Sequence, residues 1–157
     1  DGAYGFVVFW FKLLIVAVFA LVGVLAAGLD PALLGPMSWL DLSAVQWVGV
    51  ICFVISVPII ALAQVQMGRS WRIGIDQQRK TELVTGGIFM RTRNPIFLGM
   101  RINLLGLFLF LPNAATFAIW IAGELLMGLQ VRLEEAHLSK ANGANYADYS
   151  CKVRRWI

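Results

Sequence analysis

Two polar stretches of this sequence hold the side chains that are able to do chemistry, and the first is TGGIFMRTRNPIFLG, residues 85–99. Pro95 fixes its own φ and disfavours helical geometry in Asn94, so we predict that a helix begins at Pro95. Arg91 and Arg93 then lie just before a helix N-terminus, whose free N–H groups and dipole favour an anion. We interpret this loop as a site for a small charged ligand. The alternative is that both arginines anchor the helix end to lipid headgroups.

The second polar stretch follows a long apolar run and contains Glu134 and Glu135. Carboxylates at the boundary of a low-dielectric region can have raised pKa values, so they can act as bases or neutralise a cation. Tyr146 and Tyr149 are three residues apart, which places them on one face of a short helix. The alternative for the tyrosines is interfacial anchoring. His137 stands alone, and a lone surface histidine is more often incidental than catalytic.

These polar stretches are exceptions in an apolar chain. Of its 157 residues, 59% are hydrophobic and only 14% are charged, with a mean hydropathy of +0.75, whereas a soluble domain has about 25% charged residues. The sequence therefore predicts an integral membrane protein with a single domain, residues 1–157. Cys52 and Cys151 lie in different surroundings, and no Cys/His cluster has metal-ligand spacing, so we expect neither a disulfide nor a metal site.

Four apolar runs predict membrane-spanning helices, since about 20 mostly apolar residues cross a bilayer. They are residues 13–29, 45–66, 95–111 and 114–131. Lys12 interrupts the first run, so we place Trp10 and Lys12 near the headgroup layer. Only Pro112 and Asn113 separate the last two runs, which predicts a tight antiparallel helical hairpin. We therefore expect an all-α, polytopic membrane fold with four transmembrane helices.

The basic residues predict how the chain sits in the membrane. The loop between the first two runs, residues 30–43, has no Lys or Arg, whereas most of the basic residues lie in or beside residues 68–94 and 132–157. By the positive-inside rule these two segments and both termini are cytoplasmic, and we expect a bacterial inner membrane. Both segments emerge at the open ends of the hairpin, so we expect the cytoplasmic loop and the C-terminal tail to form one pocket.

The hairpin also predicts a contact between two charged residues. Facing residues of a hairpin that turns at 112–113 have numbers that sum to about 225, so Arg101 lies level with Glu124. Ionisable residues within apolar runs are costly unless paired, and they are functional candidates by default. We favour a structural ion pair that clamps the hairpin over a functional role, and we expect Asn103 to extend the same polar patch.

Several motifs of this chain occur together in one known family. VTGGIFMRTRNPIFLG, residues 84–99, is followed by the apolar hairpin, then by RLEEAHL at 132–138, GANYADY at 143–149 and VRRWI at 153–157. In this order they resemble the C-terminal half of the isoprenylcysteine carboxyl methyltransferase and phospholipid methyltransferase superfamily. Its patterns are V-T-x-G-P-Y-R-x-x-R-H-P-x-Y-x-G, E-E-x-x-L, F-G-x-x-Y-x-x-Y and V-x-R. The resemblance covers roughly residues 68–157.

The resemblance implies an integral membrane methyltransferase that binds S-adenosylmethionine between the loop and the tail. The residues that it implies for catalysis are Glu134, Glu135 and Arg93. The positions that it implies for the cofactor pocket are Val84, Gly87, Phe89, Arg93, Asn94, Pro95, Phe97, Leu98, Glu134, Tyr146 and Tyr149. Arg93 and the loop N–H groups suit the cofactor's carboxylate, Glu134 or Glu135 its cations, and the aromatic and aliphatic side chains its adenine.

The chain departs from the family pattern at five positions. Asn94 stands where the pattern often has His, so a proton relay at this position is not available. Phe89 and Phe97 stand in place of Tyr, which keeps the ring and loses the hydroxyl group. Ile88 replaces Pro, and Asn142 replaces an aromatic residue. We interpret this pattern as a retained cofactor pocket with altered substrate contacts.

We expect methyl transfer to a membrane-resident or amphiphilic small molecule, such as an isoprenylcysteine, a phospholipid or another lipophilic acceptor. The alternative is a non-catalytic accessory subunit of a larger complex, with the aromatic first helix as its contact face: Tyr4, Phe6, Phe9, Trp10 and Phe11. A membrane reductase or isomerase is a weaker alternative, because the sequence has neither a glycine fingerprint nor axial-ligand histidines. We expect membrane lipids as partners and no nucleic acid, since the basic residues follow the membrane face.

Overall fold

The computed structural model describes residues 2–28, 30–68 and 83–157. Its elements are α1 (Gly2–Ala26), η1 (Pro31–Leu34), α2 (Ser43–Met67), η3 (Gly87–Met90), α3 (Pro95–Phe110), α4 (Ala114–Asn142) and α5 (Ala144–Lys152). All of these elements are helical, so the expected all-α class is confirmed for the described part of the chain. Residue 29 of the expected first span and residues 69–82 of the expected polar loop lie outside the described residues.

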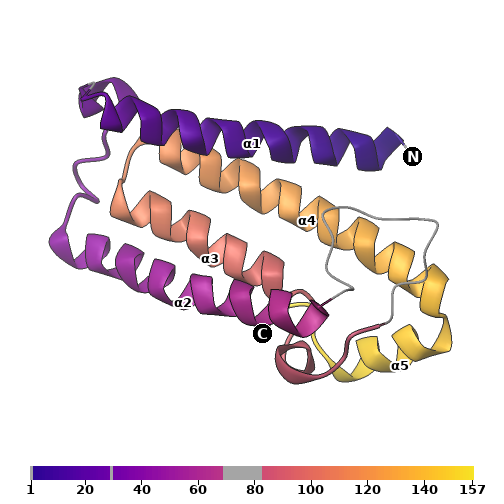
Figure 1. Ribbon diagram of the computed structural model, residues 1–157. Coiled ribbons are helices and arrows are strands. Elements are labelled where there is room, and N and C mark those ends of the chain that lie inside the picture. Colours follow the sequence, from indigo (N-terminus) through magenta and orange to yellow (C-terminus); the bar gives the residue numbers. More distant parts are fainter. Residues whose placement is uncertain (1, 29, 69–82) are drawn as a thin grey trace.

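The four long helices lie alongside one another in a bundle (Figure 1). α2 packs along α3, the hairpin brings α4 beside α3, and α1 packs on α4. One end of the bundle holds the end of α2, the start of α3, the end of α4, α5 and the C-terminus (Figure 1). We call this the polar end. It brings together the described part of the loop, residues 83–94, and the tail that follows α4.

Three helices are long and apolar enough to cross a membrane, namely α1 from Tyr4, α2 and α4. The fourth expected span, α3, has 16 residues, fewer than the about 20 that a bilayer core requires. The first helix also begins earlier than expected, at Gly2, and Lys12 lies within it. α4 continues beyond the expected end at Val131, because no residue that breaks a helix precedes Gly143. Its last turns are polar and lie beyond the apolar segment.

The predicted hairpin between α3 and α4 is present, and Asn113 explains its sharp turn. The Asn113 side chain accepts a hydrogen bond of 2.9 Å from the Thr116 N–H, which satisfies a free donor at the start of α4. The η1 loop fixes the turn from outside, since Ala114 N–H donates to the Gly35 carbonyl and Met37 N–H donates to the Pro112 carbonyl, each at 2.9 Å. The turn therefore sets the register of the two helices.

Small residues let α2 and α3 approach each other closely. Gly49, Ser56 and Ala63 recur every seven residues and are buried. A Cβ atom at Gly49 would lie 2.7 Å from the Phe110 nitrogen and 2.8 Å from the Gly106 carbonyl oxygen, which is closer than van der Waals contact. Such close backbone approach is typical of helices packed in a membrane. Near the start of α3 a Cβ atom at Gly99 would likewise lie 3.1 Å from the Ser56 carbonyl oxygen, so the close packing against α2 extends to the polar end.

α1 covers the outer side of the hairpin through a separate apolar cluster. Leu14 and Leu21 of α1 pack with Ile119 of α4, and all three are buried. Leu104 and Leu107 of α3 complete this cluster. The cluster lies within the bundle, away from the polar end, so it positions the helices and leaves the polar end for charged residues.

Replacement of Gly49 by Ala is expected to destabilise the protein, because the new methyl group would push α2 away from α3. Overpacking of this kind costs about 1 to 3 kcal/mol. The matched control is Gly128→Ala, in the interior of α4, where an added Cβ meets no atom within 4 Å and helix propensity favours alanine by about 1 kcal/mol. Thermal unfolding in detergent should show a lower Tm for Gly49→Ala only. Equal Tm values for the two variants would contradict the close packing.

Candidate functional site

The start of α3 forms as the sequence predicts. Pro95 is its first residue, and the Leu98 N–H donates to the Asn94 carbonyl at 2.9 Å. The preceding loop is attached to the end of α2, because the Ile88 N–H donates to Gln66 Oε1 at 2.8 Å. Gly87 has a φ of +61°, and a Cβ atom there would collide with the Gln66 side chain. The loop therefore needs glycine at this position.

The carboxylate of Glu135 lies at the centre of the polar end. Arg155 donates to its Oε2 from Nε at 3.0 Å and from Nη2 at 2.8 Å. Asn94 Nδ2 donates to its Oε1 at 3.1 Å, and Arg93 Nη2 lies 3.2 Å from the same oxygen. Glu135 is only 9% exposed. Two guanidinium groups and one carboxylate together carry one net positive charge. This charge favours the binding of a further anion.

The tail after α5 binds the loop through its backbone. The Arg93 N–H donates to the Arg154 carbonyl at 3.0 Å, and Thr92 Oγ1 donates to the Arg155 carbonyl at 2.9 Å. Arg93 Nη1 donates to the Ser150 carbonyl at 3.0 Å. Glu135, residues 92–94 and residues 150–155 thus form one connected network, which we call the Glu135 network.

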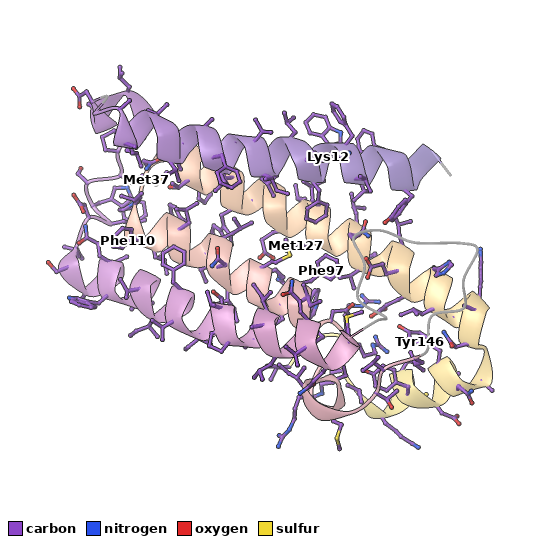
Figure 2. All side chains as sticks on the ribbon, viewed as in Figure 1. Lys12, Met37, Phe97, Phe110, Met127 and Tyr146 are labelled. Atoms are coloured by element: carbon purple, nitrogen blue, oxygen red, sulfur yellow. The ribbon has the colours of Figure 1, made fainter. Side chains whose placement is uncertain are left out.

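The two predicted tyrosines lie on α5 and are both buried (Figure 2 labels Tyr146). Tyr149 donates from its hydroxyl to the Phe89 carbonyl at 2.7 Å, and burial raises the pKa of Tyr149 to about 12. Burial, with the charge of Glu135, also raises the pKa of Tyr146, whose hydroxyl is buried without a hydrogen-bond partner in the described structure. Both tyrosines are therefore neutral donors at neutral pH.

The pKa values of two neighbouring carboxylates of α4 are shifted in opposite directions. Glu134 accepts a 2.7 Å hydrogen bond from Gln130 Nε2, but burial outweighs this bond and raises the pKa of Glu134. Burial alone would also raise the pKa of Glu135, yet the hydrogen bonds from Arg155 and Asn94 and the charge of Arg93 lower it below the ordinary value. Glu135 is therefore an anion at neutral pH. Glu134 is the carboxylate better suited to accept a proton.

The remaining predicted site residues make no hydrogen bond to Glu135. Val84 and Leu98 are half-buried, and Phe89 and Pro95 are buried. Phe97 packs against α1 instead, with its ring centroid 6.4 Å from that of Phe11 (Figure 2). The structure thus joins Arg93, Asn94 and Glu135 directly, and it places the Glu134 side chain on Gln130.

The sequence reasoning missed several residues of this end. Arg155 was not chosen, although it is the arginine of the V-x-R motif. Gln66 and Gln130 occur at the ends of apolar runs, where a polar side chain is itself a signal. Thr92 had no such signal, because its role depends on where the tail passes.

The predicted contact between Arg101 and Glu124 is present, with Arg101 Nε 2.7 Å from Glu124 Oε2. The Arg101 guanidinium also lies over the Trp156 ring, 4.4 Å from its centroid. Asn103 does not extend this patch, because it faces α2 and donates to Ser56 Oγ at 3.0 Å. A polar side chain between apolar helices bonds to the nearest available acceptor.

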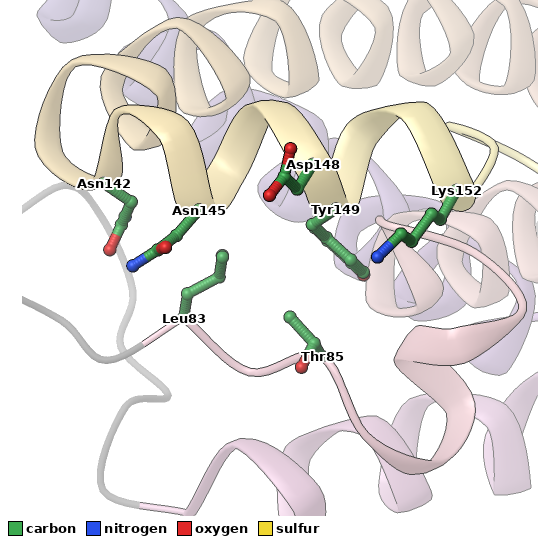
Figure 3. A pocket seen from close by; sticks show the side chains of 7 residues that line it. All are labelled: Leu83, Thr85, Asn142, Asn145, Asp148, Tyr149 and Lys152. Atoms are coloured by element: carbon green, nitrogen blue, oxygen red, sulfur yellow. The ribbon is translucent and has the colours of Figure 1, made fainter.

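An open groove of about 610 Å³ runs along α5 (Figure 3). Its lining residues are Leu83, Thr85, Asn142, Asn145, Asp148, Tyr149 and Lys152. Tyr149 alone among the predicted site residues lines it. The groove is therefore a surface feature beside the Glu135 network, and we do not assign the site to it.

Comparison with known proteins gives one result. The family model described as phospholipid methyltransferase matches residues 44–145. This range includes the loop, the hairpin and the Glu134-Glu135 pair, whereas Tyr146, Tyr149 and Arg155 follow it. No curated protein and no solved structure matches the chain.

Replacement of Glu135 by Gln is expected to destabilise the protein by about 3 to 5 kcal/mol, because it leaves two arginines without their shared anion. The pH dependence has a definite sign. Since the pKa of Glu135 is lowered in the folded state, its stabilisation is present above about pH 4.3, the unfolded value, and is lost as the pH falls through the folded pKa. When Tm is measured as a function of pH, Glu135→Gln should lack this decrease in Tm at acid pH.

The adjacent carboxylate provides a matched control. The raised pKa of Glu134 means that its ionised form opposes folding. Glu134→Gln is therefore expected to keep or raise the Tm at neutral pH. If both substitutions lowered the Tm equally, the distinction between the two carboxylates would be wrong.

Proposed function

This chain belongs to the phospholipid methyltransferase family, and we propose that it transfers a methyl group from S-adenosylmethionine to a lipid-like acceptor at the polar end. The family match itself supports methyl transfer to such an acceptor. One structural observation carries the choice of site: the Glu135 network joins the loop and the tail into a group with a net positive charge. The family match does not favour the alternative of a non-catalytic accessory subunit.

Unpartnered buried atoms support the fit of this cofactor. Arg93 Nε and the Tyr146 hydroxyl are buried donors without a partner in the described structure, and Gln130 Oε1 is a buried acceptor without one. Buried polar atoms are costly unless they are paired. The two donors suit a carboxylate. The Gln130 side chain donates from Nε2 to Glu134 Oε1 on the same helix, so the unpaired Gln130 oxygen and the Glu134 carboxylate are two neighbouring acceptors, which suit an ammonium or a sulfonium.

We therefore propose a role for each part of the pocket. Arg93 and Tyr146 bind the carboxylate of the methyl donor, and Gln130 with Glu134 faces its positive groups. The adenine lies against apolar side chains drawn from Val84, Phe89 and Leu98. When bound, S-adenosylmethionine supplies an activated methyl group on a positively charged sulfur.

The protein's own contribution is alignment, exclusion of water and proton transfer. Displacement at an activated methyl group needs a nucleophile held in line and kept dry. An amine that arrives protonated must lose its proton, and Glu134 is suited to accept it because its pKa is raised. Asn94, which replaces the family's usual histidine, orients Glu135 through its 3.1 Å hydrogen bond and cannot itself carry a proton.

We further propose that the chain crosses the membrane four times as a single domain, with the polar end and both termini on the cytoplasmic face. α3 is the shortest span, and its close packing against α2 supports its inclusion in the membrane. The positive-inside rule supports the orientation. In this arrangement a lipid acceptor reaches the polar end from the cytoplasmic leaflet.

The test is methyl transfer by the purified chain. Protein in phospholipid nanodiscs is incubated with methyl-labelled S-adenosylmethionine, and label is counted in the organic extract. We expect transfer by the parent protein, and a decrease in kcat/KM of about 100-fold or more for Glu134→Gln, the usual contribution of a general base. The parent rate should rise with pH through the raised pKa of Glu134, whereas the variant should lack this dependence.

Asp41→Asn serves as the control, because Asp41 is exposed near the opposite end of the bundle, where it bonds to Gln46. It should leave the rate unchanged. Failure of the parent protein both to bind S-adenosylmethionine in calorimetry and to label any lipid would overturn the proposed function.

Tyr146→Phe tests the binding role separately from catalysis. Loss of one neutral hydrogen bond is expected to weaken S-adenosylmethionine binding by roughly threefold to tenfold, measured as the Kd in calorimetry. The phenylalanine keeps the buried ring, so the Tm should change little. An unchanged Kd would remove Tyr146 from the proposed pocket.

A further inference from the structure

The end of the chain contacts two charged side chains through two consecutive residues. Arg155 holds Glu135 of α4 through two hydrogen bonds of 3.0 and 2.8 Å. Trp156, the next residue, lies under the guanidinium of Arg101 of α3 at 4.4 Å. The C-terminus accordingly lies beside the start of α3 in Figure 1. The tail is thus attached to both helices of the hairpin.

Arg101 is itself fixed in place. Its Nε lies 2.7 Å from Glu124 Oε2, so the guanidinium is held between an anion on one side and an indole ring on the other. Trp offers the best aromatic face for a cation. Glu124, Arg101 and Trp156 form a row that links α4, α3 and the tail, and this row is separate from the Glu135 network.

Trp156 is the last described residue whose side chain has a contact with a charged group. Ile157 follows it and is 80% exposed. Arg155 is 40% exposed in its side chain. Its backbone carbonyl accepts a hydrogen bond from the Thr92 hydroxyl on the loop side, and the contact of Trp156 with Arg101 is the next attachment along the tail.

We propose that Trp156 is a positioning residue: by stacking on Arg101 it holds the tail so that Arg155 stays paired with Glu135. Without Arg155, Glu135 would be neutralised by Arg93 alone, and the net positive charge of the network would be lost. The network would then bind an anion more weakly. This consequence rests on the proposed function, because the anion in question is the carboxylate of S-adenosylmethionine.

The first test does not depend on any ligand. The Arg93 N–H donates to the Arg154 carbonyl, so its hydrogen exchange reports whether the tail is attached. In the purified full chain, Trp156→Ala should speed exchange at Arg93 by roughly fivefold to thirtyfold, the factor that corresponds to one cation–π contact. Trp156→Phe, which keeps an aromatic face, should restore most of the protection.

Two controls separate tail release from general unfolding. The Leu98 N–H, which bonds within α3 to Asn94, should keep its protection in Trp156→Ala. Trp39→Ala, a change at an exposed tryptophan of the loop between α1 and α2, should leave exchange at Arg93 unchanged. Unaltered exchange at Arg93 in Trp156→Ala would overturn the proposal.

The second test asks whether Trp156 acts through Arg155. The Kd of S-adenosylmethionine is measured for Trp156→Ala, Arg155→Ala and the double variant. If Trp156 acts through Arg155, the double variant should bind no more weakly than Arg155→Ala. If the fold-increases in Kd of the two single variants multiply in the double variant, the two residues act independently. That result would overturn the proposal. If the parent protein binds no S-adenosylmethionine, the proposed function fails, while hydrogen exchange still decides the role of Trp156.

Discussion

The buried carboxylate of Glu135 is the constraint on which the polar end depends. A charge removed from water is costly unless it is paired and hydrogen-bonded, and Glu135 meets this condition only when three separate parts of the chain come together. Arg93 and Asn94 come from the loop before α3, Glu135 from the end of α4, and Arg155 from the tail. One ionic group therefore joins two distant polar segments into a single network and fixes the path of the tail across the start of α3.

The same network gives the adjacent carboxylates of Glu134 and Glu135 different environments. Because Glu135 is saturated by arginines, it organises the site and remains charged. Glu134 turns to another face of the same helix, where it has one neutral partner, Gln130, and a raised pKa. Two neighbours whose pKa values are shifted apart in this way can provide a charge at neutral pH and a proton acceptor within one helical turn. The close packing of α2 on α3 matters here because it fixes the start of α3, from which Asn94 reaches Glu135.

Local rules predicted the parts of this structure that depend on nearby residues. Pro95 begins α3, Pro112 and Asn113 form the hairpin turn, and helix geometry alone brought Arg101 level with Glu124. The partners of Glu135 were not predictable in this way, because they depend on the course of the tail, which no local pattern encodes. Asn103 was misassigned for a similar reason: its bond to Ser56 requires knowledge of which face of α3 meets α2.

The central claim is that the loop and the tail enclose one methyl donor around Glu135. Ultraviolet cross-linking of labelled S-adenosylmethionine to the purified protein, followed by mapping of the labelled peptides, tests it most directly. The account predicts label on peptides from both residues 83–98 and residues 130–157, displaced together by unlabelled cofactor. Specific label confined to α1 and α2, or found on only one of the two segments, would contradict it.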